Sequence, residues 1–166
     1  MRKLSAVLLL VAALPVSALA VPASVEDLAR GADAVVRGRV ASVTARWIGT
    51  RIFTFAEVDA ASVWSGSAPR RVTVITAGGV SGRLGQRVDG AALFAQGEEV
   101  VVFLTRAEGG AYRVAGLAQG KFAIAAGVAR PDVAHTSFVS VPLKPGERRS
   151  EEMPVEELER RVRGTR

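Results

Sequence analysis

The first clear pattern in the chain is a run of alternating apolar and polar positions. From Val36 to Val40 the apolar residues recur every second position, inside an extended segment that we expect over 34–48. After Val40 the apolar positions shift by one residue, to Val43 and beyond, and such a slip indicates a β-bulge. Gly38 permits a sharp bend nearby. A long, bent first strand is what a small closed barrel needs to turn a corner.

Further strands follow from the same alternation. The two-residue turn Gly49-Thr50 separates the first strand from a second one over 51–64, which predicts a β-hairpin. Val100–Leu104 is apolar on both faces and therefore predicts the most buried strand. Shorter extended segments are expected at 72–76, 91–95, 112–116, 122–126 and 133–141. Between them, Gly78–Gly90 holds five glycines and predicts the longest irregular stretch of the barrel, a place where loops often carry function.

Two helices are predicted, one at each end of the strands. Ser24 is a capping residue followed by acidic residues, which indicates a short helix over 24–30. Pro154 suits a first helical position, and the apolar residues that follow, with spacing i, i+3 and i+7, make 154–163 an amphipathic helix. A segment rich in proline, over 142–153, is a linker by its composition. We expect the C-terminal piece, 154–166, to dock on a barrel domain that spans 21–141.

The first twenty residues have the layout of a secretory signal peptide. Arg2 and Lys3 are basic, Leu4–Leu14 is apolar, and Ala18-Leu19-Ala20 supplies the small residues of a cleavage site. The apolar run is too short to span a bilayer, which takes about 20 residues. We therefore expect residues 1–20 to be cleaved, and the mature chain to be periplasmic or secreted, with no membrane span after cleavage.

Several segments resemble a known family. Ala32–Val40 reads A-D-A-V-V-R-G-R-V, Phe53–Val58 and Trp64-Ser65-Gly66 follow, and Gly97–Leu104 reads G-E-E-V-V-V-F-L. These segments resemble the netrin-like and tissue-inhibitor-of-metalloproteinase group, and the whole chain is similar to a family of uncharacterised exported bacterial proteins. The resemblance implies an OB-type barrel. The inhibitors of that group chelate the zinc of their target through an N-terminal cysteine, and this chain has no cysteine, so that mechanism does not carry over.

Composition excludes several kinds of chemistry. Without cysteine there are no disulfides, thiolate zinc sites or cysteine nucleophiles. His135 is the single histidine, so no metal site or relay can use two imidazoles of one chain. Aromatic residues make up 5% of the chain, which is few for a base-stacking surface, and nucleic acid is not an expected partner.

No catalytic constellation is recognisable in the sequence. The glycine-rich stretch lacks the Gly-Lys-Ser/Thr ending of a P-loop, and Arg83 stands where a nucleophile elbow requires glycine. His135, Ser137 and Asp132 lie too close along the chain to assemble a triad easily. Glu98 and its neighbour Glu99 should point to opposite faces of a strand. We expect no enzyme activity, no cofactor and no metal site.

Positive charge is the most informative chemical feature. The chain has 22 basic and 16 acidic residues, a net charge of +6, and between residues 34 and 130 basic residues outnumber acidic ones by twelve to six. A basic barrel attracts anionic partners, although ordinary solubilising charge in an arginine-rich chain is an alternative. The candidate contacts are Arg83 and Arg87 in the glycine-rich stretch and Arg37 and Arg39 on the first strand.

The sequence thus predicts a mainly β protein, a small antiparallel OB-like barrel of five or six strands with a short N-terminal helix and a C-terminal amphipathic helix. Its expected function is that of an exported, non-enzymatic binding module of the cell envelope or the extracellular space. The partner would be a protein or an anionic polymer. The alternative is a peptidase inhibitor that works without chelation, by inserting the Gly78–Gly90 stretch or the N-terminus into a cleft. Trp47 and Trp64 are expected to pack in the core or at the barrel end.

Overall fold

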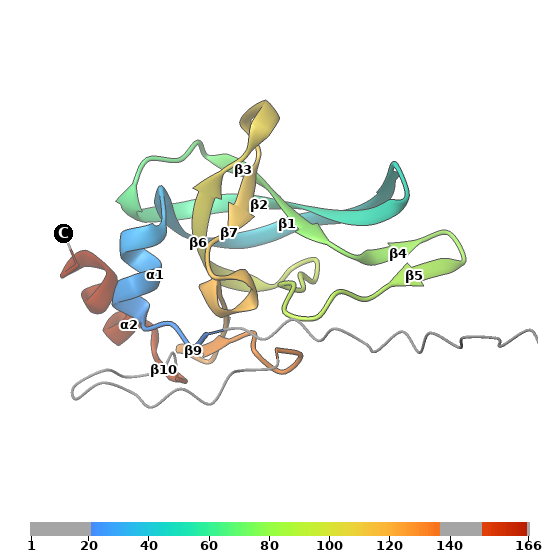
Figure 1. The fold of residues 1–166 in the computed structure, drawn as a ribbon. Coiled ribbons are helices and arrows are strands. Elements are labelled where there is room, and N and C mark those ends of the chain that lie inside the picture. Colours follow the sequence, from blue (N-terminus) through green and yellow to red (C-terminus); the bar gives the residue numbers. More distant parts are fainter. Residues whose placement is uncertain (1–20, 137–150, 166) are drawn as a thin grey trace, which may run out of the picture.

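The structure, a computed structural model, describes residues 21–136 and 151–165 (Figure 1). In chain order the elements are α1 (Val25–Gly31), β1 (Ala34–Ile48), β2 (Arg51–Gly66), β3 (Arg71–Ala77), β4 (Gly79–Ser81), β5 (Leu84–Gln86), β6 (Glu99–Arg106), the 3-10 turn η1 (Glu108–Gly110), β7 (Tyr112–Val114), the 3-10 turn η2 (Leu117–Gly120), β8 (Lys121–Ala125), β9 (Val128–Pro131), β10 (Met153–Pro154) and α2 (Val155–Arg163). None of these helices is long and apolar enough to cross a membrane.

Five strands close into a barrel. The hydrogen-bonded order is β1-β2-β3-β7-β6, and β6 pairs again with β1, which completes the ring. The pairings are antiparallel except between β3 and β7, which run parallel at Val74 and Tyr112. This closed ring, with a short helix before it and a helix at the C-terminal end, confirms the predicted mainly β, OB-like fold.

The first strand bends as its sequence indicates. Its pairing with β2 shifts register between Val40 and Ser42, at the predicted slip, and at two earlier points, after Val35 and after Arg37. A Cβ at Gly38 would lie 2.3 Å from the backbone oxygen of Asp59, so glycine is required for β1 and β2 to approach this closely. The bend brings the N-terminal half of β1 against β6 while its C-terminal half continues along β2 alone.

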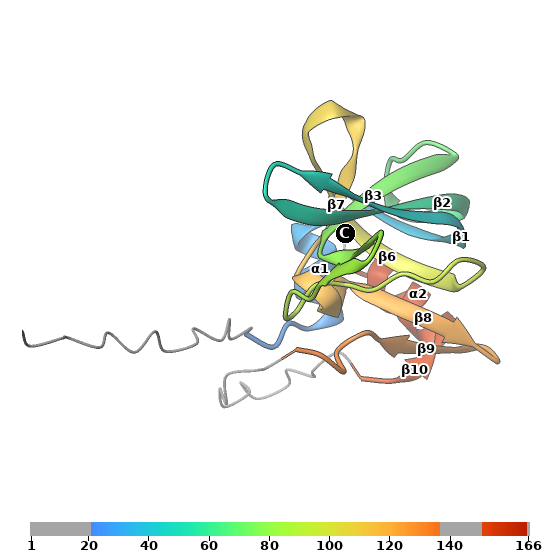
Figure 2. The same ribbon diagram turned by 90° about the vertical axis from the view of Figure 1, so that its right-hand side faces the viewer.

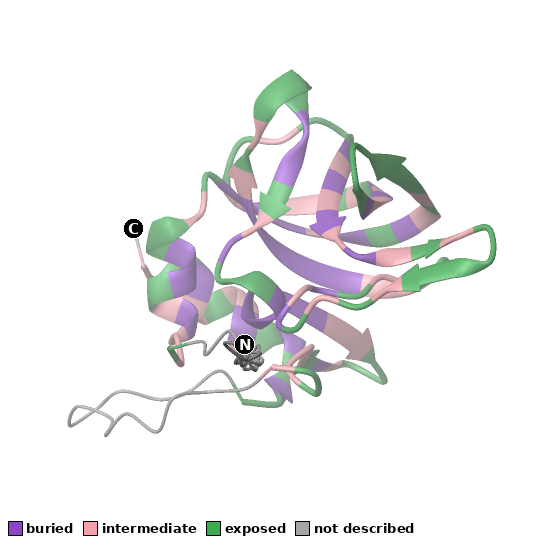
Figure 3. Cartoon of the chain, turned by 45° about the vertical axis from the view of Figure 1, so that its right-hand side comes forward, coloured by how far each residue is buried: buried purple, intermediate pink, exposed green. Residues whose placement is uncertain are grey.

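Two hydrophobic cores lie on opposite faces of β6. Val100, Val102 and Leu104 point into the barrel, and Val101 and Phe103 face the layer that contains the helices. All five side chains are fully buried, which confirms the prediction that this strand is the most buried one (purple in Figure 3). The strict alternation of a β-strand divides one apolar run between two cores.

The second layer contains β8, at the strand predicted over 122–126, and two strands that the sequence did not predict, β9 and β10. Beyond η2, β8 resumes pairing along β6, and β9 and β10 extend the sheet. The strand predicted over 122–126 ends before Ala126 because Ala126 and Gly127, with φ of 50° and 76°, turn the chain into β9. No strand forms at 91–95 or at 133–136, contrary to expectation, and residues 137–141 lie outside the described residues. Met153, expected in the linker, is buried in β10; linker residues 142–150 lie outside the described residues.

The two helices pack against each other and against this layer. Val155, Leu158 and Val162 of α2 lie in the same core as Val25 and Leu28 of α1. The apolar residues whose spacing predicted the C-terminal helix therefore form the face that the helix buries. The helix begins at Val155, directly after Pro154.

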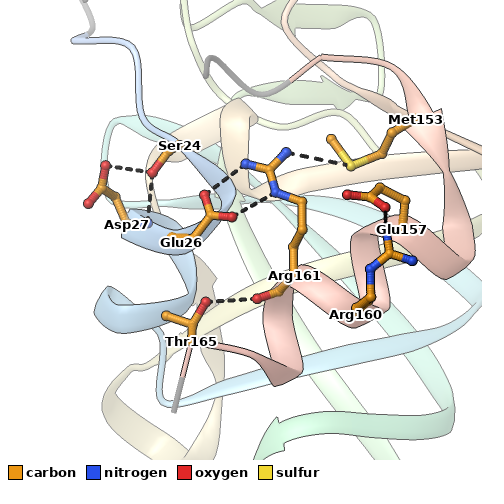
Figure 4. A network of polar contacts seen from close by, with 8 residues as sticks. All are labelled: Ser24, Glu26, Asp27, Met153, Glu157, Arg160, Arg161 and Thr165. Atoms are coloured by element: carbon orange, nitrogen blue, oxygen red, sulfur yellow. Dashed lines mark hydrogen bonds and ion pairs between the residues drawn. The ribbon is translucent and has the colours of Figure 1, made fainter. Parts of the chain in front are cut away.

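An ion pair joins the helices at the surface of this core (Figure 4). The Nε and Nη2 atoms of Arg161 donate to the two carboxylate oxygens of Glu26, each at 2.7 Å. This hydrogen-bonded pairing lowers the pKa of Glu26 and raises the pKa of Arg161. Thr165 closes the end of α2 by donating its hydroxyl to the backbone oxygen of Arg161.

Candidate binding surface

The glycine-rich stretch forms a short hairpin rather than the irregular loop expected from its sequence. Strands β4 and β5 pair from Gly79 with Gln86 to Ser81 with Leu84, and the turn passes through Gly82, whose φ is 63°. We call β4, β5 and this turn the arm. The glycine-rich sequence did not indicate strands here, because the pairing of β4 with β5 depends on contacts between the arm and β2.

Strand β2 holds the base of the arm. The backbone N–H of Ile52 donates to the side-chain oxygen of Gln86 at 2.7 Å, and Gly78 donates to the backbone oxygen of Ile52 at 2.8 Å. A Cβ at Gly79, where φ is 127°, would lie 2.3 Å from the hydroxyl oxygen of Thr54. Glycine at this position therefore lets the arm lie directly against the β1–β2 hairpin.

The end of the β1–β2 hairpin and the arm project to the same side of the barrel (Figure 1), and Figure 2 views the molecule from that side. We define the finger surface as residues 43–54 and 77–88. Four of its large apolar side chains are exposed, with exposed fractions of 48% for Trp47, 50% for Ile48, 70% for Val80 and 60% for Leu84, whereas Ile52 is buried. The predicted packing of Trp47 is thus wrong, because the hairpin carries it beyond the barrel, whereas Trp64 is buried as expected.

The finger surface is basic throughout. It carries four exposed arginines and no acidic residue, although Asp89 follows directly after it; the arginines are Arg46, Arg51, Arg83 and Arg87. Within residues 21–136 and 151–165 none of the four takes part in an ion pair. Most other exposed arginines in these ranges are paired, among them Arg71 with Asp59 and Arg130 with Glu152, although Arg70 and Arg113 also form no ion pair there. The charge of the finger surface is therefore not neutralised by the folded chain.

Two hollows border the arm. One, of about 290 Å³, is lined by Val43, Ala45, Val80, Leu93 and Phe94, among others, and so receives side chains from both projecting hairpins. The other, of about 340 Å³, is lined by residues that include Val80, Arg87 and His135. In this second hollow a guanidinium nitrogen of Arg87 lies against the Nδ1 atom of His135.

The structure divides the four predicted contact residues into two sets. Arg83 and Arg87 lie in or beside the arm. Arg37 and Arg39 lie on β1 beside the start of β6, where Arg37 donates to Glu99 at 2.7 and 2.9 Å and Arg39 donates to the backbone oxygen of Gly97 at 2.6 Å. Their guanidinium groups hold β1 to β6, so they are less available to a partner than the arginines of the finger surface.

The residues considered for catalysis do not converge in the described part of the chain. His135 faces Arg87, whereas Asp132 accepts a hydrogen bond from the backbone of Leu93 and lies 3.6 Å from Lys121. Ser137 lies outside the described residues. Nor do residues 21–136 and 151–165 hold a cluster of three or more residues suited to binding a metal.

Sequence reasoning missed one buried charge, Lys121. Its side chain is 4% exposed, and its ammonium group lies 2.8 Å from a carboxylate oxygen of Glu98. It also lies 5.2 Å above the ring centre of Phe94, a cation–π contact. Lys121 stands in the buried strand segment next to Phe122, and a lysine in such a position is a signal of a paired charge. These contacts with Glu98 and Phe94 hold the segment that precedes β6, in which Leu93 and Phe94 line the hollow beside the arm.

No protein-family model, curated protein or solved structure matches the chain. The function is therefore argued from the chain's own residues.

Proposed function

We propose that the protein is an exported, non-enzymatic binding module and that the finger surface is its contact with the partner. The observation that carries the proposal is the combination of four exposed, unpaired arginines with four exposed, large apolar side chains on two projecting hairpins. Large apolar side chains exposed beside arginines on projecting segments are typical of contact sites. Arginine and tryptophan are also the residues that contribute most to binding at interfaces.

The other lines of the proposal come from the sequence. The leader over residues 1–20 supports export, so the protein would work in the periplasm or outside the cell. The similarity to the netrin-like and tissue-inhibitor group stays a prediction. An anionic partner, whether a protein or a polymer, follows from the uncompensated charge of the finger surface.

Capture experiments with charge-matched variants test this proposal. The tagged mature protein, the arm variant R83A/R87A and the control variant R106A/R163A would be incubated with material from the native culture, and the retained molecules quantified. The control removes the same charge from exposed arginines that pair with Asp33 and Glu159. We expect the control to retain what the wild type retains and the arm variant to lose it. Equal capture by the arm variant would exclude the arm as the contact.

A second candidate, inhibition of a peptidase without chelation, is favoured by the projection of the arm. The exposed tip of the arm is a projecting hairpin turn, the kind of segment that can enter the active-site cleft of a peptidase. The other candidate segment, the start of the mature chain, is engaged: the Gln119 side chain accepts from the backbone of Ala23 at 2.8 Å and donates to that of Val21 at 3.0 Å. Secreted metallo- and serine proteases assayed with the mature protein test this candidate, and full activity of all of them would dismiss it.

A further inference from the structure

The position of the apolar side chains on the finger surface narrows the class of partner. Trp47 and Ile48 lie at the end of the β1–β2 hairpin, and Val80 and Leu84 lie on either side of the turn of the arm. They are the most exposed large apolar side chains of the two hairpins, and the end of the arm is green in Figure 3. Trp47, Ile48 and Leu84 thus stand on two protruding tips outside the hollow between the hairpins, whereas Val80, the most exposed of the four, also lines that hollow.

Three of the four arginines stand beside these tips, and Arg87 follows Gln86 at the base of the arm. Arg46 precedes Trp47, Arg51 begins the returning strand, and Arg83 lies between the two apolar residues of the arm. Arg46 is stacked 4.1 Å from the ring centre of Phe55, so its charge is held at the side of the hairpin. Apolar tips flanked by unpaired cations match the two layers of a lipid surface, which has an acyl boundary beneath anionic headgroups.

A protein partner fits this arrangement less well. The two tips are separate, and besides Arg83 the residues between their apolar side chains are glycine and small hydroxyl residues, Gly49-Thr50 and Ser81-Gly82, so the tips offer no continuous apolar patch for a complementary protein face. A fluid surface needs no matching shape and can receive both tips at once. Tryptophan is moreover enriched at the membrane–water interface, where its ring is half buried and half hydrated.

We infer that the finger surface docks on an anionic lipid bilayer, with Trp47, Ile48, Val80 and Leu84 at the acyl boundary and Arg46, Arg51 and Arg83 against the phosphates. The inference rests on the proposed function in taking the finger surface as the contact, and it names an anionic lipid surface in place of a protein or polymer partner. Each arginine near an anionic surface strengthens binding about fivefold, so loss of Arg83 at the tip together with Arg87 at the base should weaken it between about fivefold and 30-fold. Binding should also weaken as salt is raised.

Vesicle sedimentation with the full chain, purified after export, tests the charge requirement. The vesicles would be phosphatidylcholine alone or phosphatidylcholine mixed with phosphatidylglycerol. We expect binding to the mixed vesicles, the loss just stated for R83A/R87A, and a change within about twofold for R106A/R163A, whose arginines lie off the finger surface. Equal loss in both variants would overturn the inference, because the effect would then follow net charge alone.

Tryptophan fluorescence tests the insertion itself. The chain has two tryptophans, and Trp64 is 3% exposed in the core beneath the helices, out of reach of lipid. Phosphatidylglycerol-containing vesicles with brominated acyl chains should therefore quench Trp47 in the wild type and leave the remaining emission of the variant W47F unquenched. Binding without quenching of Trp47 would contradict insertion of the β1–β2 tip.

Failure of this inference can be told apart from failure of the proposed function. If the protein ignores anionic vesicles while R83A/R87A still loses the partner captured from the native culture, the lipid inference is wrong and the finger surface binds an acidic protein or polymer. If neither vesicles nor native material respond to the arm variant, both proposals are wrong.

Discussion

The ion pair between Glu26 and Arg161 allows the attachment of the C-terminal helix to be measured. The substitution Glu26→Gln keeps the shape of the side chain but removes its charge. A glutamine can accept one of the two hydrogen bonds at 2.7 Å, while its amide nitrogen faces a guanidinium group that can only donate. The variant therefore loses one hydrogen bond and the attraction between the charges, with little change in packing.

The magnitude follows from the partial burial of the pair. The side chain of Arg161 is 16% exposed and that of Glu26 is 37% exposed. Breaking a fully buried pair costs about 3–5 kcal/mol, and an exposed pair is worth about 0–1 kcal/mol. Because solvent screens the Glu26 side of the pair, we expect Glu26→Gln to lower the free energy of unfolding by about 1–2 kcal/mol at neutral pH.

Glu156→Gln is the matched control. Glu156, like Glu26, stands in the first turn of its helix, but it is exposed and forms no ion pair within the described residues. It therefore tests the loss of a carboxylate from a helix N-terminus alone, which costs about 0.3–1 kcal/mol. Urea unfolding followed by circular dichroism at several pH values measures both variants against the wild type.

The pH dependence gives the result that would refute this reasoning. Arginine lowers the pKa of Glu26 in the folded state below its ordinary value of 4.5, so the stabilisation is fully present above that value and is lost as the pH falls through the folded-state pKa. The gap between wild type and Glu26→Gln should thus close in acid. A gap that stayed constant from neutral to acid pH would show that packing, and not charge, accounts for the loss.

Three further substitutions test the cores and the close approach of strands. Lys121→Met leaves Glu98 and Asp132 without their cation and should lower the free energy of unfolding by about 2–4 kcal/mol in urea titration; an unchanged midpoint would contradict the buried pairing. Leu158→Ala, at a fully buried position of α2, should cost about 2–5 kcal/mol by the same assay. Gly38→Ala forces a Cβ against the backbone of β2 and should lower the free energy of unfolding by about 1–3 kcal/mol, which would appear as a lower thermal midpoint. A raised midpoint would contradict this close approach.

Features fixed by neighbouring residues were predictable from the sequence. Ser24 does accept a hydrogen bond from the backbone of Asp27, and the apolar shift after Val40 does mark a bulge. In each case the signal lies within a few residues of the structure that it predicts, because helix caps and strand alternation are local properties. The burial of Val100–Leu104 was predictable for the same reason, because a strand that is buried on both faces has apolar residues at every position.

Features fixed by distant residues were not predictable. The arm forms because Ile52 and Thr54 hold its base, and β10 forms because Met153 reaches β9 across the chain. Neither pairing produces a recognisable strand pattern in the residues that form it. The same holds for Lys121, whose partner Glu98 lies 23 positions away, and for Trp47, whose exposure depends on how far the hairpin extends beyond the barrel.

The separation of the finger surface from the cores bears on how binding variants can be interpreted. None of the four exposed apolar residues, and none of the four arginines, belongs to either hydrophobic core. Substitutions at such positions change the free energy of unfolding by no more than about 0.5 kcal/mol, so R83A/R87A and W47F should unfold at the wild-type urea concentration. A loss of binding in a variant that keeps this midpoint then reports a lost contact. It also follows that burial in the two cores does not explain tryptophan, isoleucine, valine and leucine at these tips, because none of them belongs to either core and each keeps about half or more of its side chain exposed.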